Sequence, residues 1–324
     1  MNGLQLSKSL FDETGLPLLK RTCPEALDRL AAGLSGGSQC HGHDDAVSRD
    51  HGWGPSFAVW LPVDSFGSHA PKIRAALAAG LPAEYAGFAN VACTVMEFDQ
   101  YVREVVGVSE APGDPYEWLR IPEEALFEIT HRPVFYDPSG FASARFQSFA
   151  TYPEDVWKKR LEACLFWLWE WGVKHLKRAE LRDDRLAAAW YWMHFAEHAA
   201  RTAFLLERSY APYHKWLFRM AAELSPSNAM VVRMIIDASS EERRYNSAAS
   251  ISRLILERLR ELGIPEIEED DRSPVAYPDL PEIHMYRRGL ISSIKDERIK
   301  AVPAGQSVIL PPTKGTTTWF RPAQ

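Results

Sequence analysis

The sequence predicts an α+β protein in which an N-terminal mixed sheet with helices is followed by a C-terminal helical bundle. Before residue 150, short apolar runs alternate with helical patterns and with turns rich in Gly and Pro. After Tyr152, helical patterns follow one another with short joints as far as Gly263, which is typical of a bundle. The chain has 324 residues, enough for about two domains of roughly 100–200 residues each.

Three apolar runs in the N-terminal region predict strands of a buried sheet. They cover residues 56–63 (SFAVWLPV), 90–98 (NVACTVMEF) and 133–136 (PVFY). Helical patterns are expected at residues 24–32, 68–79, 98–106 and 122–129. Strands that alternate with helices indicate a layered domain, which we place at residues 1–150.

The C-terminal region predicts five helices and then a tail. The helices are expected at residues 156–176, 184–207, 213–224, from 226 onward, and 248–262. They define a bundle domain at residues 151–263. From Gly263 onward the chain has many prolines and an acidic run at 266–271, so residues 264–324 are expected to form an extended tail that packs on the domains.

Composition argues against several classes of function. The 37 basic and 43 acidic residues leave a net charge of −6, and no basic run is interleaved with aromatics, which argues against a nucleic-acid track. No apolar run reaches the roughly 18 residues of a membrane span. The N-terminus lacks the apolar centre of a signal peptide, and the four cysteines are scattered. We expect a reduced, cytoplasmic protein.

The segment at residues 33–55 (GLSGGSQCHGHDDAVSRDHGWGP) carries most of the functional information. Glycines beside Ser38 let backbone N–H groups approach a phosphate. The nearby acids Asp44, Asp45 and Asp50 precede an apolar strand. Mg²⁺ in a triphosphate complex takes one or two carboxylates plus phosphate oxygens. The alternative is a polar surface loop whose glycines make turns and whose aspartates cap helices.

The order of helix, Gly-Ser turn, acid and strand resembles the nucleotidyltransferase superfamily, which includes aminoglycoside nucleotidyltransferases and DNA polymerase beta. Residues 31–55, 133–145 (PVFYDPSGFASAR) and 205–219 (LLERSYAPYHKWLFR) are similar to a bacterial family of nucleotidyltransferase-like proteins of unknown function. The resemblance implies a nucleotidyltransferase-like N-terminal domain. It also implies that Gly37 and Ser38 hold the nucleotide phosphates, that Asp50 is the first metal-binding acid, and that Lys215 reaches the phosphates or the substrate.

The acid pattern departs from that superfamily in two places. The second acid of the acid-x-acid motif should stand at position 52, which is Gly52, and the third should lie in the strand at 90–98, where only Glu97 occurs. Asp44 or Asp45 could substitute for the missing acid. Alternatively, the protein binds a nucleotide without transferring it. Both interpretations stay open.

A second motif offers a different chemistry. His194, Glu197 and His198 spell HxxEH, and on a helix the i, i+4 histidines share one face, as in inverted zinc proteases. A third ligand would be needed for zinc. The competing interpretation is a helix face that lines a cleft, with no bound metal.

These observations favour a nucleotidyltransferase that uses Mg²⁺ and a nucleoside triphosphate, with ATP as the expected nucleotide. Asp50 with Asp45 or Asp44 would hold the metal, and Gly37, Ser38 and Lys215 would bind the phosphates. Glu197 or His198 would deprotonate a small-molecule acceptor. The alternatives are an inactive nucleotide-binding or interaction protein and a zinc hydrolase. The acceptor stays open, with a tRNA end or a protein side chain among the choices, and so do the nucleotide preference, the oligomeric state and the pathway.

Overall fold

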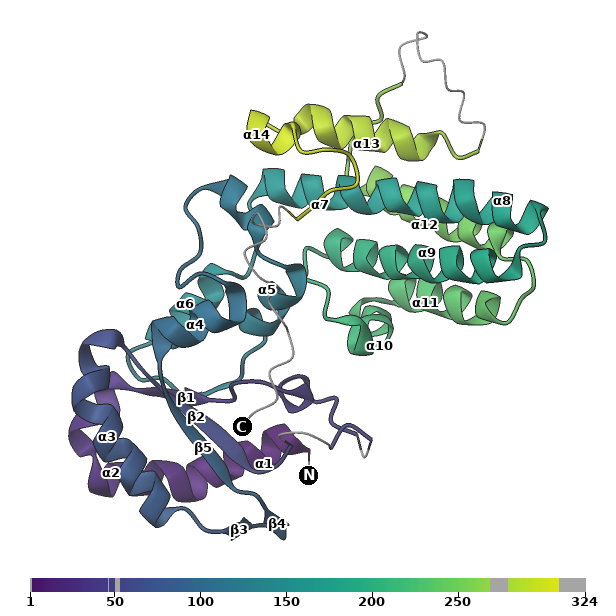
Figure 1. Ribbon diagram of the computed structural model, residues 1–324. Helices are drawn as coiled ribbons and strands as arrows, with labels where there is room; N and C mark the ends of the chain where they lie inside the picture. Colours follow the sequence, from purple (N-terminus) through teal and green to yellow (C-terminus); the bar gives the residue numbers. More distant parts are fainter. Residues whose placement is uncertain (1, 46, 50–52, 269–278, 309–324) are drawn as a thin grey trace. The chain divides into compact units, whose positions relative to one another are not determined.

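The structure, a computed structural model, describes residues 2–45, 47–49, 53–268 and 279–308 (Figure 1). It divides into two compact units. Unit 1 comprises Met1–Pro112 and Ala125–Ala150, and unit 2 comprises Gly113–Glu124 and Thr151–Gln324. A mixed sheet in unit 1 and many helices in both units confirm the predicted α+β class.

The sheet of unit 1 has four strands in the order β5-β2-β1-β6. Its strands are β1 (Ala31–Gly33), β2 (Ser56–Leu61), β5 (Ala92–Glu97) and β6 (Val134–Tyr136). Strand β1 is antiparallel to both β2 and β6, whereas β2 and β5 are parallel. The end of β1 therefore lies at the same edge of the sheet as the starts of β2 and β5. A separate hairpin is formed by β3 (Glu84–Tyr85) and β4 (Phe88–Ala89).

The helices of unit 1 include one π-helix and two 3-10 helices near the N-terminus. The elements are α1 (Gly3–Leu10), π-helix η1 (Phe11–Gly15), α2 (Leu16–Thr22), 3-10 helices η2 (Pro24–Arg29) and η3 (Ser38–His41), α3 (Val63–Gly80), α4 (Phe98–Val106), α5 (Glu123–Thr130) and α6 (Phe141–Ser148). Glu123 and Glu124 at the start of α5 are grouped with unit 2.

Strand β2 is buried on both faces, which explains its continuous apolar sequence. Phe57 and Val59 belong to a core that also contains buried side chains of α2 and α3. Trp60 points to the opposite face, where its ring lies 5.2 Å from that of Tyr101 and 5.8 Å from that of Phe146. The two helical layers on either side of the sheet are visible in Figure 1.

The predicted helix at 24–32 ends earlier than expected, and a strand follows it. Residues Pro24–Arg29 form the 3-10 helix η2, and the small residues Ala31 and Ala32 then enter the sheet between β2 and β6. At Gly33 an added Cβ would lie 2.1 Å from the carbonyl oxygen of Pro133. Close packing of neighbouring backbones, which only the tertiary structure reveals, overrides the local helical pattern.

Unit 2 is a helical bundle. Its elements are 3-10 helix η4 (Pro115–Arg120), α7 (Glu154–Trp167), π-helix η5 (Leu168–His175), α8 (Leu176–Leu181), α9 (Arg185–Leu206), α10 (His214–Leu224), α11 (Pro226–Ser239), α12 (Tyr245–Glu261), α13 (Glu282–Ser293) and α14 (Glu297–Lys300). The expected helix at 156–176 thus consists of α7, η5 and the start of α8. The core gathers buried residues from α7 to α9 and from α11 to α13.

The region expected to be an extended tail contains the helices α13 and α14. Helix α13 packs along α7 (Figure 1) and buries Ile283, Tyr286 and Leu290. Gly289 weakens the helical pattern in the sequence, but an added Cβ there would lie 1.8 Å from the carbonyl oxygen of Pro265. The glycine is needed because another segment crosses the helix at this point.

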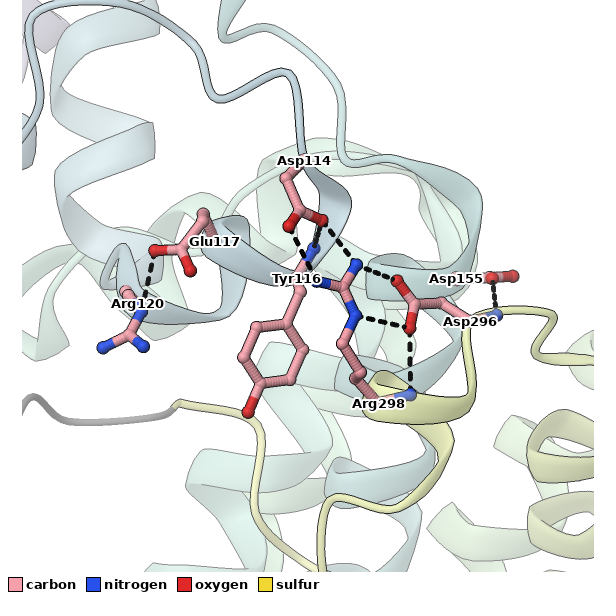
Figure 2. Close-up of polar contacts among 7 residues, drawn as sticks. All are labelled: Asp114, Tyr116, Glu117, Arg120, Asp155, Asp296 and Arg298. Carbon is pink, nitrogen blue, oxygen red and sulfur yellow. Dashed lines mark hydrogen bonds and ion pairs between the residues drawn. The ribbon is translucent and has the colours of Figure 1, made fainter.

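Figure 2 shows how Arg298, in α14, is bound to the segment that precedes α5. Both terminal guanidinium nitrogens donate to Asp114, at 2.8 and 2.7 Å. A further contact joins Arg298 to Asp296, at 2.7 Å. Asp155, near the start of α7, accepts hydrogen bonds from the backbone N–H groups of Lys295 and Asp296. These contacts tie residues near 114 and 296 to the bundle.

None of the helices in the described residues is both long and apolar enough to cross a bilayer.

A buried group of charges fastens α13 to α7. Glu162 is fully buried and accepts hydrogen bonds from Lys159 at 2.7 Å and from Arg287 at 2.7 Å. Lys159 also donates to the carbonyl oxygen of Val302. The buried Lys159 and the partly buried Arg287 thus depend on one carboxylate.

Glu162→Gln is therefore expected to destabilise the protein by about 3–5 kcal/mol, because the buried Lys159 and the partly buried Arg287 lose their compensating charge. Glu154→Gln, on the same helix, is the matched control, since Glu154 forms an exposed pair with Arg208 and should change stability by less than about 1 kcal/mol. Urea unfolding measures both. Equal losses in the two variants would contradict the account.

His284 makes stability depend on pH. Burial, together with the nearby Arg287 and Arg288, lowers the pKa of His284 from 6.5 to about 4. Between these values the unfolded chain takes up a proton that the folded chain does not, so stability falls as the pH falls from about 6.5 to about 4. His284→Gln should lose less stability between pH 7 and pH 5 than the parent does, as measured by thermal unfolding. An equal loss in both proteins would contradict this prediction.

Candidate functional site

The glycine turn, residues 36–38, lies where β1 ends and η3 begins. Gly37 precedes η3 with φ 90° and ψ 163°, a conformation that essentially only glycine adopts. Within the part of the chain that the structure describes, the backbone N–H groups of Gly37 and Ser38 donate to no acceptor. The Ser38 hydroxyl makes no hydrogen bond there either. The turn therefore offers donors that the protein itself does not use.

A cavity of about 300 Å³ lies beside this turn, at the edge of the sheet where β1 ends and β2 and β5 begin. It is lined by the turn and by the first residues of both strands: Leu34, Ser35, Gly36, Gly37, Gln39, Ser56, Phe57, Ala92, Cys93 and Thr94. Its volume lies at the lower end of the range for small-molecule sites. The glycines thus border an open space, and not a packed core.

A buried cation, Arg132, supports the turn. One of its terminal nitrogens donates to the Cys40 sulfur at 3.5 Å, and the same nitrogen lies 3.6 Å from the position that a Cβ on Gly36 would occupy. Arg132 also pairs with Glu128 at 2.9 Å. Burial alone would raise the pKa of Glu128, but its contacts with His41 and Arg132 outweigh burial and lower the pKa.

The acids predicted to bind a metal have different environments. Asp44 is 5% exposed, and its Oδ2 accepts from the Gly3 N–H at 2.6 Å and from the Trp53 indole at 2.8 Å. Its Oδ1 is buried without a hydrogen bond. Asp45 is exposed, and its Oδ1 caps the backbone N–H groups of Val47 and Ser48. Asp50 lies outside the described residues, as does Gly52.

Glu97, the only acid in the strand at 90–98, has a structural role. It precedes α4, and its two carboxylate oxygens accept from the backbone N–H groups of Asp99 and Gln100 at 2.7 and 3.0 Å. This is helix capping. The structure gives no support to a third metal-binding acid at this position.

The remaining predicted residues, Lys215 and Glu197, belong to unit 2. Lys215 is exposed near the start of α10, and its ammonium group lies 5.0 Å from the centre of the Trp216 ring. Glu197 lies on α9, beside a second cavity.

This second cavity, the unit 2 cavity, has a volume of about 260 Å³. Helices α7 and α9, the start of α5 and the segment at 305–308 contribute its walls: Pro122, Glu123, Glu124, Arg160, Ala163, Cys164, Trp167, Glu197, His198, Arg201, Leu205, Gly305, Ser307 and Val308. Arg201 contacts three of the carboxylates in this lining. It contacts Glu123 at 3.2 Å, Glu124 at 2.6 Å and Glu197 at 3.0 Å.

His198 is held as a neutral ring. Its Nδ1 lies 2.8 Å from the carbonyl oxygen of His194, so this nitrogen carries the proton and Nε2 is left as an acceptor. Burial lowers the pKa of His198. Burial would raise the pKa of Glu197, but Arg201 and His198 outweigh it and lower that pKa.

The zinc interpretation of the HxxEH motif finds no support in the described residues, which contain no group of three His, Cys, Asp or Glu side chains that could hold a metal. The His194 ring packs against Trp190 at 4.0 Å. Glu197 is bound to Arg201. Glu197 and His198 line the unit 2 cavity instead.

Sequence patterns did not single out Arg132, nor did they bring Glu123 and Glu124 together with Arg201. A weak signal was present for Arg201, because Glu197 stands four residues before it on a helix. No local pattern could show that Glu123 and Glu124 meet Arg201, which lies 78 and 77 positions further along the chain.

Comparison with known proteins adds little to this geometry. Residues 118–217 match a family model described as a domain of unknown function, DUF4037. No curated protein matches the chain. Among solved structures, a nucleotidyltransferase-like protein from Exiguobacterium sibiricum 255-15 is similar with a TM-score of 0.36 and 13% identity, over 88% of this chain and 91% of that chain. A likeness this low carries no argument about fold or reaction.

The two glycines of the turn should differ in their tolerance of a side chain. Gly37→Ala is expected to cost about 1–3 kcal/mol, because its backbone conformation is essentially restricted to glycine. Gly36→Ala is the control, since its Cβ would make only an ordinary contact with Arg132. Urea unfolding separates the two, and equal stability of both variants would show that Gly37 does not hold this conformation.

Proposed function

We propose that unit 1 binds a nucleoside triphosphate at the glycine turn and that the protein is a nucleotidyltransferase. In the proposed reaction, an acceptor oxygen forms a bond to the α-phosphorus of the nucleotide while the bond to the departing pyrophosphate breaks. ATP is the expected nucleotide. The observation that carries this proposal is the pair of unused backbone N–H donors at Gly37 and Ser38, beside a cavity.

The chemistry of the turn suits a phosphate. Successive backbone N–H groups in a turn form a concave donor site for anions, and the Ser38 hydroxyl adds another donor. Arg132 places a positive charge behind the turn, close to Gly36, where low exposure limits its screening by solvent.

The acids near the turn fit a bound Mg²⁺ in part. Asp44 has a buried carboxylate oxygen that makes no hydrogen bond, and Mg²⁺ prefers such oxygen ligands. Asp45 uses one oxygen for capping. Asp44 and Asp50 would hold the ion, with Asp45 as a further candidate, and the metal would neutralise charge on the phosphates.

The acceptor is proposed to be a small molecule. Lys215 would supply a positive charge near the phosphates or the substrate, and His198 or Glu197 would take a proton from the acceptor hydroxyl.

One observation favours a second candidate function, nucleotide binding without transfer. Glu97 is used for capping and position 52 is glycine, so two of the three acids expected in the superfamily have no evident equivalent. Transfer and binding differ only in whether pyrophosphate is released.

Titration with ATP, GTP, CTP and UTP, with and without Mg²⁺, tests nucleotide binding. One nucleotide should bind in a magnesium-dependent way. Ser38→Ala should weaken it about tenfold or more, because a hydrogen bond to a charged group is lost, and Asp50→Ala should remove the magnesium dependence. Ser148→Ala is the control, since Ser148 is exposed on α6. If no nucleotide binds, the proposal fails; if one binds but no acceptor triggers pyrophosphate release, the second function is favoured.

A further inference from the structure

Two of the three carboxylates that line the unit 2 cavity are more exposed than its guanidinium groups, while the third, Glu123, is buried. The side chains of Glu124 and Glu197 are 33% and 31% exposed, whereas that of Arg201 is 14% exposed. Arg160 is 4% exposed. A ligand that enters the cavity therefore meets carboxylates first.

The guanidinium group of Arg201 is already engaged with the protein. It binds three carboxylates through Nε and both terminal nitrogens, so its positive charge is more than balanced. Arg160 donates to the carbonyl oxygen of Ile121 at 2.8 Å and lies over the Tyr152 ring at 5.3 Å, and its Nε is buried without a hydrogen bond. The charge of Arg201 is therefore not available to an anionic ligand.

The hydrogen-bond acceptors, in contrast, are only partly used. Glu197 and Glu124 each bind Arg201 through Oε1, and neither Oε2 contacts a donor among the described residues. The Nε2 atom of His198 likewise contacts no donor among the described residues. It is an acceptor because Nδ1 carries the proton. Three acceptor atoms, one from α5 and two from α9, therefore line the cavity and have no donor partner among the described residues.

We propose that the unit 2 cavity binds a small organic cation that carries a primary ammonium group. The three N–H donors of an ammonium group match the three available acceptors, and its charge balances the excess of three carboxylates over two guanidinium groups. Trp167 also lines the cavity, and an indole attracts a cation that reaches its face. The volume of about 260 Å³ limits the ligand to a small molecule.

This site shares no residue with the proposed nucleotide site, because all residues that form it belong to unit 2. It does contain Glu197 and His198, which are also the proposed bases of the transfer reaction. The cation site is tested without nucleotide or Mg²⁺, so its failure can be distinguished from a failure of nucleotide binding.

The experiment is a calorimetric titration of the full chain with butane-1,4-diamine at 150 mM salt, without nucleotide. The neutral analogue butane-1,4-diol has the same length and is the ligand control. Glu197→Gln and Glu124→Gln each remove one charge and keep an oxygen that can accept from Arg201. Glu154→Gln is the protein control, because it removes one exposed carboxylate from unit 2 outside the cavity.

The diamine should bind and the diol should not. Glu197→Gln and Glu124→Gln should each weaken binding about tenfold, which corresponds to about 1.4 kcal/mol, while Glu154→Gln should leave the affinity within about twofold. Circular dichroism confirms that the variants fold, and two cavity variants keep the test valid if one does not. Equal binding of the diol, no binding of the diamine, or the same effect for all three substitutions would overturn the proposal.

Discussion

The arrangement of the unit 2 cavity depends on the charge of Arg201. A guanidinium group that is largely removed from water has to be compensated by nearby anions, or its desolvation is too costly. Here it draws the start of α5 and the middle of α9 to one point, because Glu123 and Glu124 come from the first and Glu197 from the second. The excess of carboxylates around one cation is what makes the cavity acidic.

A related constraint operates in unit 1, where Arg132 is buried behind the glycine turn. Its charge is compensated by Glu128, which in turn contacts His41 in η3 at 3.3 Å. The same cation therefore helps to fix the position of η3 and adds positive potential near the turn. In unit 1 a buried arginine with one carboxylate partner lies behind the proposed phosphate site, and in unit 2 an arginine is surrounded by three carboxylates at the proposed cation site.

Local patterns predicted the elements whose environment is simple. Strand β2 is buried on both faces, so its apolar run was recognisable, and α4 has the expected bounds of 98–106. Patterns failed where another part of the chain decides the conformation. Residues 31–33 form a strand because β2 and β6 flank them, and α13 contains a glycine because the Pro265 backbone crosses it. None of these neighbouring segments is close in sequence to the residues that it contacts.

The sequence by itself determined the α+β class, the glycine turn and the presence of acids around it, because these depend on residue types over short stretches. Only the tertiary structure decided which polar groups already have a partner within the protein. Glu97 caps a helix, Glu197 is bound to Arg201, and Asp44 keeps one oxygen without a hydrogen bond. The reason is physical: whether a carboxylate is available to a ligand depends on its burial and partners, and those partners come from distant parts of the chain.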